Sequence, residues 1–509
     1  MNKRNILIGT TLAIIITAII TTFVALKPNS ADYTCAIPKN VQMVATFDLA
    51  SIIKKTGIDT QDANNKSITT LAGILTKYGL GNNTKFLEHP EEMGIDINQK
   101  VFIFSTPDKS LCLLAKIANK KQALDFMTAL SEDDICEKPI EKKDIYWTKI
   151  LGELPTAVND QTIIMMLPSE KIQNPEDDIT KMLQQKEDDC FINTAKGQEL
   201  IQADGDISMT AILSALAESP TPFTELLPKG VRASEVELHT SILFLEGKMV
   251  MNTKIVSQNK KMQELLNEIN ENTQKINRLY IPISSKNLRL WASAGINGEW
   301  LLKQMKKNKD IKQYLFLLER AIDIEKMIKS INGDIMIALP SPSKEENKYE
   351  IPYVVTAQTK SQDFLNDIDY WTTSMKEYGM TMVATTENMY KLTAEDNIFY
   401  WGTNPYELYF TSSPSLIADK QSNKETNVIT ALEQEIKNSR FYLYINVEQM
   451  NQDGICNDLD GIPMFSLLPH TIEDICISAD NANNLKTTFR MKEKNTNALK
   501  TIINNVLGY

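Results

Sequence analysis

Histidine, the side chain best suited to proton transfer at neutral pH, is scarce in this sequence. The three histidines are His89, His239 and His470. His89 stands beside Pro90 and Glu91, and a histidine next to carboxylates would suit a general base or a metal ligand. A histidine in a polar turn is more often structural, however, and none of the three has a His or Cys partner at metal-ligand spacing. The histidines therefore predict no catalytic residue and no metal ligand.

Cysteine is the next candidate, because it can supply a nucleophile, a metal ligand or a disulfide. The cysteines show no Cys-x-x-Cys spacing, which argues against a zinc site and against a dense disulfide framework. The sequence favours cysteines that serve as small buried hydrophobic residues. The alternative is one or two disulfides formed after export. The six residues are Cys35, Cys112, Cys136, Cys190, Cys456 and Cys476.

Acidic residues gather in three short stretches. Residues 451–461 are rich in Asn, Asp and Gly and could hold calcium, but they lack the spacing and the final Glu of an EF-hand, which favours a turn-rich loop. Residues 174–178 read as the start of a helix, with a cap, a proline and acids in the first turn. Residues 187–190 read as a solvated run. With no Gly-x-Ser-x-Gly, Walker or dinucleotide-binding pattern, the sequence predicts no catalytic, cofactor-binding or metal-binding residue.

The composition is that of a folded protein with more acid than base. The 509 residues are 42% hydrophobic and 23% charged, which is typical of globular domains with sizeable cores. The formal net charge is −11 and no predicted helix stands out as rich in Lys and Arg. Because nothing attracts a phosphate backbone, nucleic acid is not expected as a partner.

The N-terminal residues predict a membrane anchor. Residues 6–26 are 21 uncharged, mostly apolar residues, which as a helix would span roughly 31 Å. Lys3 and Arg4 precede them, so the positive-inside rule keeps residues 1–5 in the cytoplasm and sends the rest of the chain outward. We predict an uncleaved signal anchor, with a cleaved signal peptide as the alternative. Lipidation of Cys35 is disfavoured by the residues before it.

The rest of the chain reads as a tandem duplication. The frame Pro-x-x-x-Leu-Leu-Pro occurs at residues 222–228 and returns at residues 463–469, as expected for a short helical turn bounded by prolines. Each copy is followed by two alternating runs and an amphipathic helix. The predicted first repeat is residues 36–270, the linker is residues 271–284 and the second repeat is residues 285–509.

Each half is predicted to read β-α-ββ-α-ββ-α-β-α-ββ-α. Two-residue alternation in the strands predicts sheets with one face on a core, and therefore an α+β class with mostly antiparallel strands behind one N-terminal transmembrane helix. Asp48 and Asn297 are predicted helix caps at matching places. The matching strand pairs are 41–49 with 288–296, 101–105 with 335–339, 111–117 with 353–357, 235–245 with 473–478, and 249–255 with 485–491.

Several of these features resemble a known family. They are the charged start with its apolar anchor, the opening at residues 37–49, the Ile-Asn-Gly-Glu turn at residues 296–299, and the closing residues 485–506. Together they resemble the exported Bacteroides-type proteins grouped as domain of unknown function 4836, over nearly the whole chain. The resemblance implies a location in the cell envelope and implies no catalytic residues.

Two classes of function follow from these observations. The first is a membrane-anchored, non-catalytic binding or scaffolding module of the cell envelope, with the bulk of the chain on the periplasmic side and an envelope protein or polymer as its partner. The alternative is an envelope hydrolase with paired carboxylates, which needs two acids about 5 to 10 Å apart in one cleft. The halves repeat core and turn residues while their polar residues differ, which favours binding.

Overall fold

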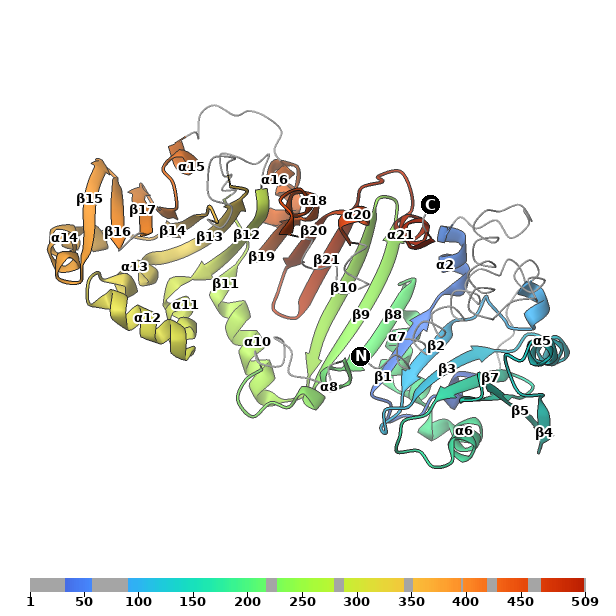
Figure 1. Cartoon of the computed structure of the whole chain (residues 1–509). Helices are drawn as coiled ribbons and strands as arrows, with labels where there is room; N and C mark the ends of the chain where they lie inside the picture. Colours follow the sequence, from blue (N-terminus) through green and yellow to red (C-terminus); the bar gives the residue numbers. More distant parts are fainter. Residues whose placement is uncertain are drawn as a thin grey trace. The chain divides into compact units, whose positions relative to one another are not determined.

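The fold was analysed in a computed structural model (Figure 1). The structure describes residues 33–56, 90–216, 227–278, 288–342, 351–394, 397–418, 428–455 and 468–507. The predicted anchor and most of both Pro-x-x-x-Leu-Leu-Pro frames lie outside these ranges. Within them, no helix has both the length and the apolar composition needed to cross a membrane.

The chain divides into two compact units. Unit 1 is Met1–Asn259 together with Glu493–Tyr509, and unit 2 is Lys260–Lys492. The C-terminal segment is tied to unit 1, where the Gly247 amide donates to the Thr496 carbonyl (2.8 Å) and the Asn497 side chain donates to the Phe244 carbonyl (3.1 Å). The chain therefore enters unit 2 after residue 259 and returns to unit 1 after residue 492. The predicted boundaries of the two repeats stay a prediction, because these units are defined by contacts and not by sequence repetition.

Unit 1 contains an antiparallel array of strands. Side by side, the strands run in the order β4-β5-β6-β7-β3-β2-β1-β8-β9-β10, and each adjacent pair is antiparallel. The strands are β1 (Met43–Phe47), β2 (Val101–Ser105), β3 (Leu111–Lys116), β4 (Ile140–Lys142), β5 (Ile145–Ile150), β6 (Leu154–Val158), β7 (Thr162–Leu167), β8 (Ile207–Ile212), β9 (Val236–Leu245) and β10 (Lys248–Ser257).

Unit 2 repeats this order strand for strand. The order is β15-β16-β17-β18-β14-β13-β12-β19-β20-β21, again with every adjacent pair antiparallel, and the short β11 (Thr273–Gln274) also pairs with β12. The strands are β12 (Leu288–Asn297), β13 (Ile331–Pro340), β14 (Val354–Thr359), β15 (Met380–Thr386), β16 (Met389–Ala394), β17 (Asn397–Asn404), β18 (Glu407–Thr411), β19 (Phe441–Asn446), β20 (Ile472–Ala479) and β21 (Asn484–Met491). The class is thus mixed α and β with antiparallel sheet, as predicted.

Helices connect the strands in both units. Several begin at a polar cap: Asn119 and Asn297 each accept a hydrogen bond from a backbone amide of the first turn, and Asp48 accepts one from Ser51 (2.9 Å), so the predicted caps Asp48 and Asn297 are confirmed. Unit 1 contains α2 (Leu49–Thr56), α5 (Lys120–Glu132), α6 (Pro175–Leu183), α7 (Ala195–Gln202), α8 (Leu213–Leu216) and α21 (Ala498–Leu507). Unit 2 contains α10 (Lys260–Asn272), α11 (Gly298–Met305), α12 (Lys309–Glu319), α13 (Ile324–Ser330), α14 (Ile368–Glu377), α15 (Ser415–Ala418), α16 (Val428–Ala431), α17 (Glu433–Lys437), α18 (Val447–Gln452) and α20 (Leu468–Thr471).

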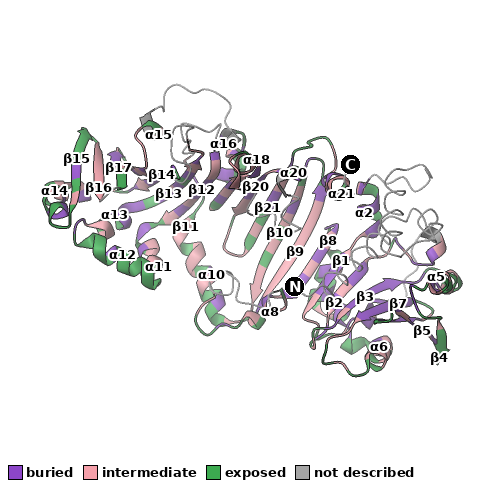
Figure 2. Ribbon diagram, viewed as in Figure 1, coloured by how far each residue is buried: buried purple, intermediate pink, exposed green. Residues whose placement is uncertain are grey.

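Alternation along the strands builds a core on each face of the sheet of unit 1. Phe102 and Phe104 of β2 are buried in a cluster with Ile37, whereas Val101 is buried on the other face in a cluster with Leu49. Figure 2 shows buried residues concentrated in these strands. In unit 2, the rings of Trp291 and Tyr442 meet edge to face in the main cluster, at 6.4 Å between centroids.

In the second ββ unit of each half, where the sequence predicted two strands, the structure contains four. The additional strands are β4 and β6 in unit 1 and β15 and β16 in unit 2. β4 is short and exposed, β6 contains Pro155, which argues against a strand, and most of β15 is exposed, so none carries a clear alternating pattern. The helix after β14, α14, begins at Ile368 after a 3₁₀ turn at Asp363–Asp367.

Candidate functional site

Two of the three histidines, His239 and His470, lie in the described part of the chain. His89 lies outside the described residues, and His470 is exposed at the end of α20. His239 on β9 lies between two carboxylates, 3.5 Å from Glu199 and 3.6 Å from Glu237. Over the described ranges, no three His, Cys, Asp or Glu side chains are grouped so that they could hold a metal ion.

The Asn- and Asp-rich stretch at residues 451–461 is described only as far as residue 455. There, Asp453 forms an ion pair with Arg289 and accepts a hydrogen bond from Ser341 (2.6 Å). Burial works to raise the pKa of Asp453, but the hydrogen bonds from Ser341, Arg289 and Gln449 outweigh it, and the pKa lies below its ordinary value. This carboxylate is therefore ionised and already engaged by protein groups.

The two other acidic stretches border a hollow of about 650 Å³ in unit 1. Asp178 comes from the stretch at α6, and Asp189 comes from the 3₁₀ turn Glu187–Asp189. The sequence explained each stretch locally, as a helix start and a solvated run, and could not place them together. The lining residues are Pro38, Lys39, Asn40, Thr106, Pro107, Asp108, Met166, Ile172, Asp178, Lys181, Met182, Gln185 and Asp189.

The walls of the hollow are held by covalent and backbone links between distant segments. A disulfide joins Cys35 to Cys190 across 155 residues. Beside it, the Lys39 amide donates to the Asp189 carbonyl, and the Phe191 amide donates to the Ile37 carbonyl, each at 2.8 Å. These links fix the segment after Tyr33–Ala36 against the turn after α6, so one wall of the hollow is preorganised.

Asp108 is the most closely organised polar group in the hollow. It lies in the turn between β2 and β3, where the Ser110 hydroxyl donates to its carboxylate (2.5 Å) and the Ser169 hydroxyl approaches at 3.3 Å. Partial burial works to raise the pKa of Asp108, but hydrogen bonds from Ser110, Thr106 and Ser169 outweigh it and lower the pKa below its usual value. The carboxylate is therefore ionised at neutral pH.

The rest of the hollow combines an exposed cation with buried apolar side chains. Lys181 and Asp178 form an ion pair one turn apart on α6 (2.7 Å), and the lysine side chain is 76% exposed. The hydrogen bond to Asp178 raises the pKa of Lys181, so its ammonium group is charged. The floor includes Met166 and Met182, both buried. Flexible methionines adapt to different apolar shapes, so the hollow suits a ligand with both apolar and charged groups.

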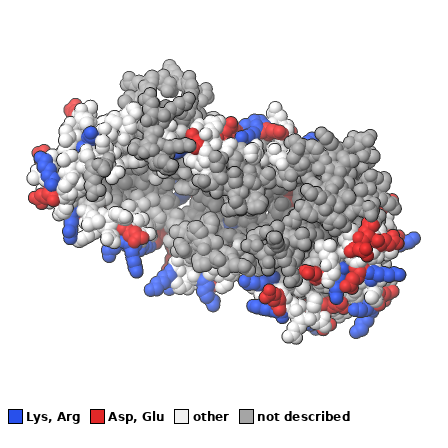
Figure 3. Space-filling view, viewed as in Figure 1, with Lys and Arg blue, Asp and Glu red and all other residues white. Residues whose placement is uncertain are grey.

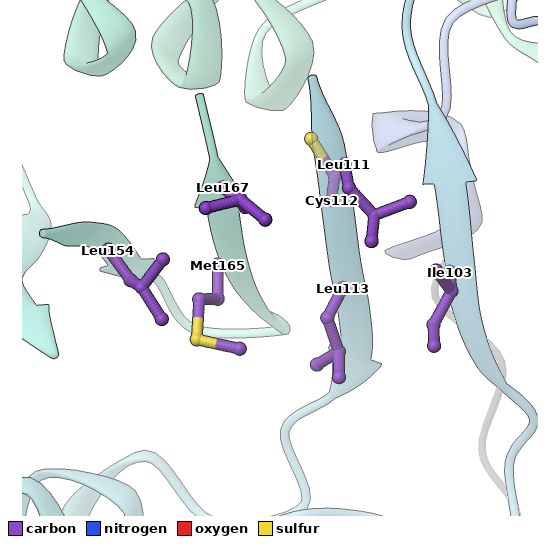
Figure 4. A pocket seen from close by; sticks show the side chains of 7 residues that line it. All are labelled: Ile103, Leu111, Cys112, Leu113, Leu154, Met165 and Leu167. Atoms are coloured by element: carbon purple, nitrogen blue, oxygen red, sulfur yellow. The ribbon is translucent and has the colours of Figure 1, made fainter. Parts of the chain in front are cut away.

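A second cavity in unit 1 is too small for a ligand. It lies between β2, β3, β6 and β7 and has about 10 Å³, roughly the space of one water molecule. Figure 4 shows its apolar lining, in which Leu154, Met165 and Leu113 face the same space. It is a packing gap beside the cluster that contains Leu113, Leu154 and Met165 on one face of the sheet. It provides no polar side chain for chemistry.

The free cysteines of the described residues are buried, and burial makes a thiol a poor nucleophile. Cys112, Cys136 and Cys476 are buried free cysteines. Burial raises the pKa of Cys476 to about 11, although the nearby Arg490 opposes the shift. A thiol with so high a pKa carries little thiolate at neutral pH, so this cysteine is a structural residue.

Comparison with known proteins agrees with the resemblance found in the sequence. The family described as "Domain of unknown function (DUF4836)" matches residues 33–499. The chain belongs to this family. The match covers both units of the DUF4836 protein, so the strand order seen twice here lies within the region that defines the family.

Other comparisons add no functional information for this DUF4836 chain. No curated protein matches it. Crystal form IV of TP0453 is similar with a TM-score of 0.28 and 9% identity, over 47% of this chain and 85% of that chain. Crystal form III of the same protein gives 0.28 and 10%, over 49% and 90%.

Proposed function

We propose that this DUF4836 protein is a membrane-anchored, non-catalytic binding module of the cell envelope. The single observation that carries the binding role is the 650 Å³ hollow of unit 1, in which Asp108 is ionised and a disulfide fixes one wall. The occupant we propose is an extended segment of an envelope partner protein, with an envelope polymer as the other candidate. Acidic and basic rim groups with a methionine floor match the mixed chemistry of a polypeptide.

The proposed location is the outer face of the cell membrane. The apolar residues 6–26, preceded by Lys3 and Arg4, support a single N-terminal span with the chain exported behind it. The disulfide between Cys35 and Cys190 supports the same location, because such bonds persist in oxidising compartments outside the cytoplasm.

Duplication explains how the binding module is built. The two units share one strand order over ten successive positions, although their polar residues differ. We propose that a duplicated sheet-and-helix unit supplies the scaffold and that unit 1 acquired the hollow on it. Nucleic acid is not a proposed partner, since the chain is acidic overall.

The alternative function is a hydrolase, and three carboxylates in one hollow are the observation in its favour. A paired-carboxylate mechanism needs one acid that keeps its proton near neutral pH, which usually requires a raised pKa. The pKa of Asp108 is lowered instead, and Asp178 is paired with Lys181. These facts favour binding over hydrolysis.

In-cell crosslinking followed by affinity purification and mass spectrometry tests the binding role. We expect the wild-type chain to retain a stoichiometric envelope partner, and Asp108→Asn and Lys181→Glu to lose it while both variants stay folded, as cooperative thermal unfolding will show. Asp144→Asn is the matched control, because this exposed acid on the turn between β4 and β5 does not line the hollow.

Two outcomes would overturn the proposal. If both hollow variants retain the partner as the wild-type does, the hollow is not the binding site. If a stable single carboxylate variant abolishes a hydrolytic activity of the wild-type chain, the protein is an enzyme. An N-terminal tag that is lost during export would separately overturn the retained anchor.

A further inference from the structure

Strand β15 leaves one edge of the sheet of unit 2 open. Among the described strands it pairs only with β16, and it stands at the end of the strand order of unit 2 (Figure 1). In an edge strand, the backbone N–H and C=O groups of alternate residues point away from the sheet. Such a row of backbone groups is a template on which another strand can pair.

β15 is long and uncharged for an edge strand. Its seven residues, Met-Thr-Met-Val-Ala-Thr-Thr, include no charged residue and no proline. Most of them are exposed, as Figure 2 also shows, and the exposed fraction of Val383 is 60%. Natural edge strands are usually protected by charge, proline, a bulge or short length. The register shifts only between Ala384 and Thr386, so residues 380–384 present a regular, unprotected edge.

The equivalent edge of unit 1 is protected. β4 holds the same place in the strand order, but it has three residues, of which Glu141 and Lys142 are charged. Glu141 accepts a hydrogen bond from the Tyr146 hydroxyl, and Lys142 forms an ion pair with Glu176, each at 2.9 Å. Two copies paired through β4, with their cores on one side of the sheet, would place Glu141 opposite Glu141 or Lys142 opposite Lys142. Like charges directly opposite each other are unfavourable, so this edge resists pairing between copies.

We propose that β15 is the contact surface between two copies of this chain, which pair their β15 strands antiparallel about a twofold axis. In such a pair each residue lies opposite a residue of the same strand, so a charge near the axis would face a like charge. β15 meets this condition because it has no charge. With the axis at Met382, Thr381 of one copy lies opposite Val383 of the other, and both residue types suit strands.

The core face of β15 adds apolar contact to this pair. Met382 is buried in a cluster that includes Trp371 and Trp401, and Met380 packs at the edge of the cluster. Pairing about Met382 places this side chain beside its counterpart in the other copy, so the two cores join across the contact. Flexible methionines adapt readily to such a new apolar neighbour.

The lack of charge also favours a second copy over an unrelated strand. A strand that joins a sheet edge gains affinity from main-chain hydrogen bonds and specificity from the side chains beside the edge. Figure 3 shows mostly uncharged side chains over β15 and β16, with charged side chains around them. The nearest charged residues along the chain, Glu377 and Glu387, are exposed and lie outside β15. This edge thus selects no foreign strand by charge, whereas a copy of β15 matches it by symmetry.

Sedimentation velocity of the full-length chain in detergent, over a range of protein concentrations, tests the proposal. We expect a reversible dimer, because a pair of short strands is a small interface. Thr381→Lys with Val383→Lys should weaken dimerisation by at least roughly tenfold, and so should Thr381→Glu with Val383→Glu, because each variant places like charges opposite each other. An equimolar mixture of the two variants should dimerise again, since a lysine strand then faces a glutamate strand.

Matched controls separate pairing through β15 from other events. Ile140→Lys adds a charge at the equivalent edge strand β4, where the isoleucine is exposed, and should leave the dimer unchanged. Thr381 and Val383 are exposed, so both charge variants should stay folded, and recovery of the dimer in the mixture confirms it. Hydrogen exchange of the wild-type chain should slow in β15 as the protein concentration rises, and it should not slow in the lysine variant.

Four results would overturn the inference. The first is a wild-type chain that is monomeric at every concentration. The second is a dimer that neither charge variant weakens, which would place the contact elsewhere, for example at the proposed anchor. The third is a mixture of the two variants that stays monomeric although both are folded. The fourth is slow exchange in β15 at all protein concentrations, which would mean that another segment of the same chain covers the edge. None of these results bears on the hollow of unit 1, which capture of the partner tests separately.

Discussion

The two units place a polar pair at the same position of the same strand but stabilise it differently. In unit 1, Ile212 of β8 faces Glu237, and in unit 2, Asn446 of β19 faces Asp474, so these two acids are equivalent. Two residues later along each strand stand His239 and Cys476. One fold thus carries an acid and a histidine in one unit and an acid and a thiol in the other.

The difference comes from the next strand. Asp474 faces Arg490 of β21, which donates to its carboxylate at 2.6 Å. Glu237 faces Val256 of β10 and takes its cation, Lys196, from α7 instead, at 2.5 Å.

The acid in unit 2 is also more deeply buried than its equivalent in unit 1. The Asp474 side chain is 5% exposed and the Glu237 side chain is 20% exposed. In unit 1, the Glu237 Oε2 and His239 Nε2 atoms are buried without a hydrogen-bond partner in the described structure. The two acids occupy equivalent backbone positions in the two units. The cation that pairs with each acid comes from a different element, Lys196 from a helix and Arg490 from a strand.

The largest loss of stability is expected when Arg490 is removed. Arg490→Met leaves Asp474 buried without its cation, and breaking a buried pair in this way costs about 3–5 kcal/mol. We expect a loss of this size in the free energy of unfolding, measured by denaturant titration with hydrogen exchange of β19 and β20 as the local readout.

The double variant is the control for that measurement. Arg490→Met combined with Asp474→Leu removes both charges and should recover most of the loss, because apolar pairs often replace buried ion pairs without cost. If Arg490→Met alone costs less than about 1 kcal/mol, the pair behaves like a surface ion pair and the contrast between the units fails.

Reduction of the disulfide should weaken unit 1 and leave unit 2 unchanged. The bond between Cys35 and Cys190 lies wholly within unit 1, and a crosslink over a long loop typically contributes about 2–4 kcal/mol. We expect Cys35→Ser with Cys190→Ser to increase hydrogen exchange in β1 and β2. Equal exchange changes in β12 and β13 of unit 2 would contradict independent stabilisation of the two units.

Two buried acids of unit 2 and one acid of unit 1 should contribute to the pH dependence of stability in opposite directions. Burial raises the pKa of Asp334 and of Asp474 in unit 2, whereas the hydrogen bonds from Ser110, Thr106 and Ser169 lower the pKa of Asp108 in unit 1. An acid with a raised pKa contributes stability below its unfolded pKa, and this contribution is lost as the pH rises through the folded pKa. An acid with a lowered pKa contributes stability above its unfolded pKa, and this is lost as the pH falls through the folded pKa.

The measurement compares Asp334→Asn with Asp108→Asn between acidic and neutral pH. Asp334→Asn should flatten the loss of unit 2 stability as the pH rises, and Asp108→Asn should flatten the loss of unit 1 stability as the pH falls. Each change is measured as the difference between the wild-type and variant chains in the dependence of the free energy of unfolding on pH. If the two variants shift the pH profile in the same direction, the assigned environments are wrong.

The sequence predicted the scaffold far better than the site. Strand alternation and the caps Asp48 and Asn297 are local signals, and the structure contains the corresponding β1, β12, α2 and α11. The hollow is lined by residues from several segments between positions 38 and 189, which are far apart in the sequence. Six cysteines allow many pairings, so no local pattern indicated the bond between Cys35 and Cys190. Only the two acidic stretches gave a signal, and each had a sufficient local explanation.

The exposed apolar residues of α12 were missed for a different reason. No helix was predicted to be rich in Lys and Arg, and α12 has two lysines, one Asp and one Glu. Periodicity indicates which side of a helix is apolar but not whether a partner covers it, so the exposure of Tyr314 and Leu317 had no signal in the sequence.

The smallest predicted effect completes the comparison between the two acids. Lys196→Met removes the cation from Glu237, but both side chains reach solvent, with exposed fractions of 51% and 20%. Water replaces most of the lost interaction, so we expect a change of about 0.2–1 kcal/mol in the free energy of unfolding, well below that of Arg490→Met. The same denaturant titration measures it. A loss as large as that of Arg490→Met would contradict the comparison. It would mean that Lys196 on a helix stabilises Glu237 as strongly as Arg490 on the neighbouring strand stabilises Asp474.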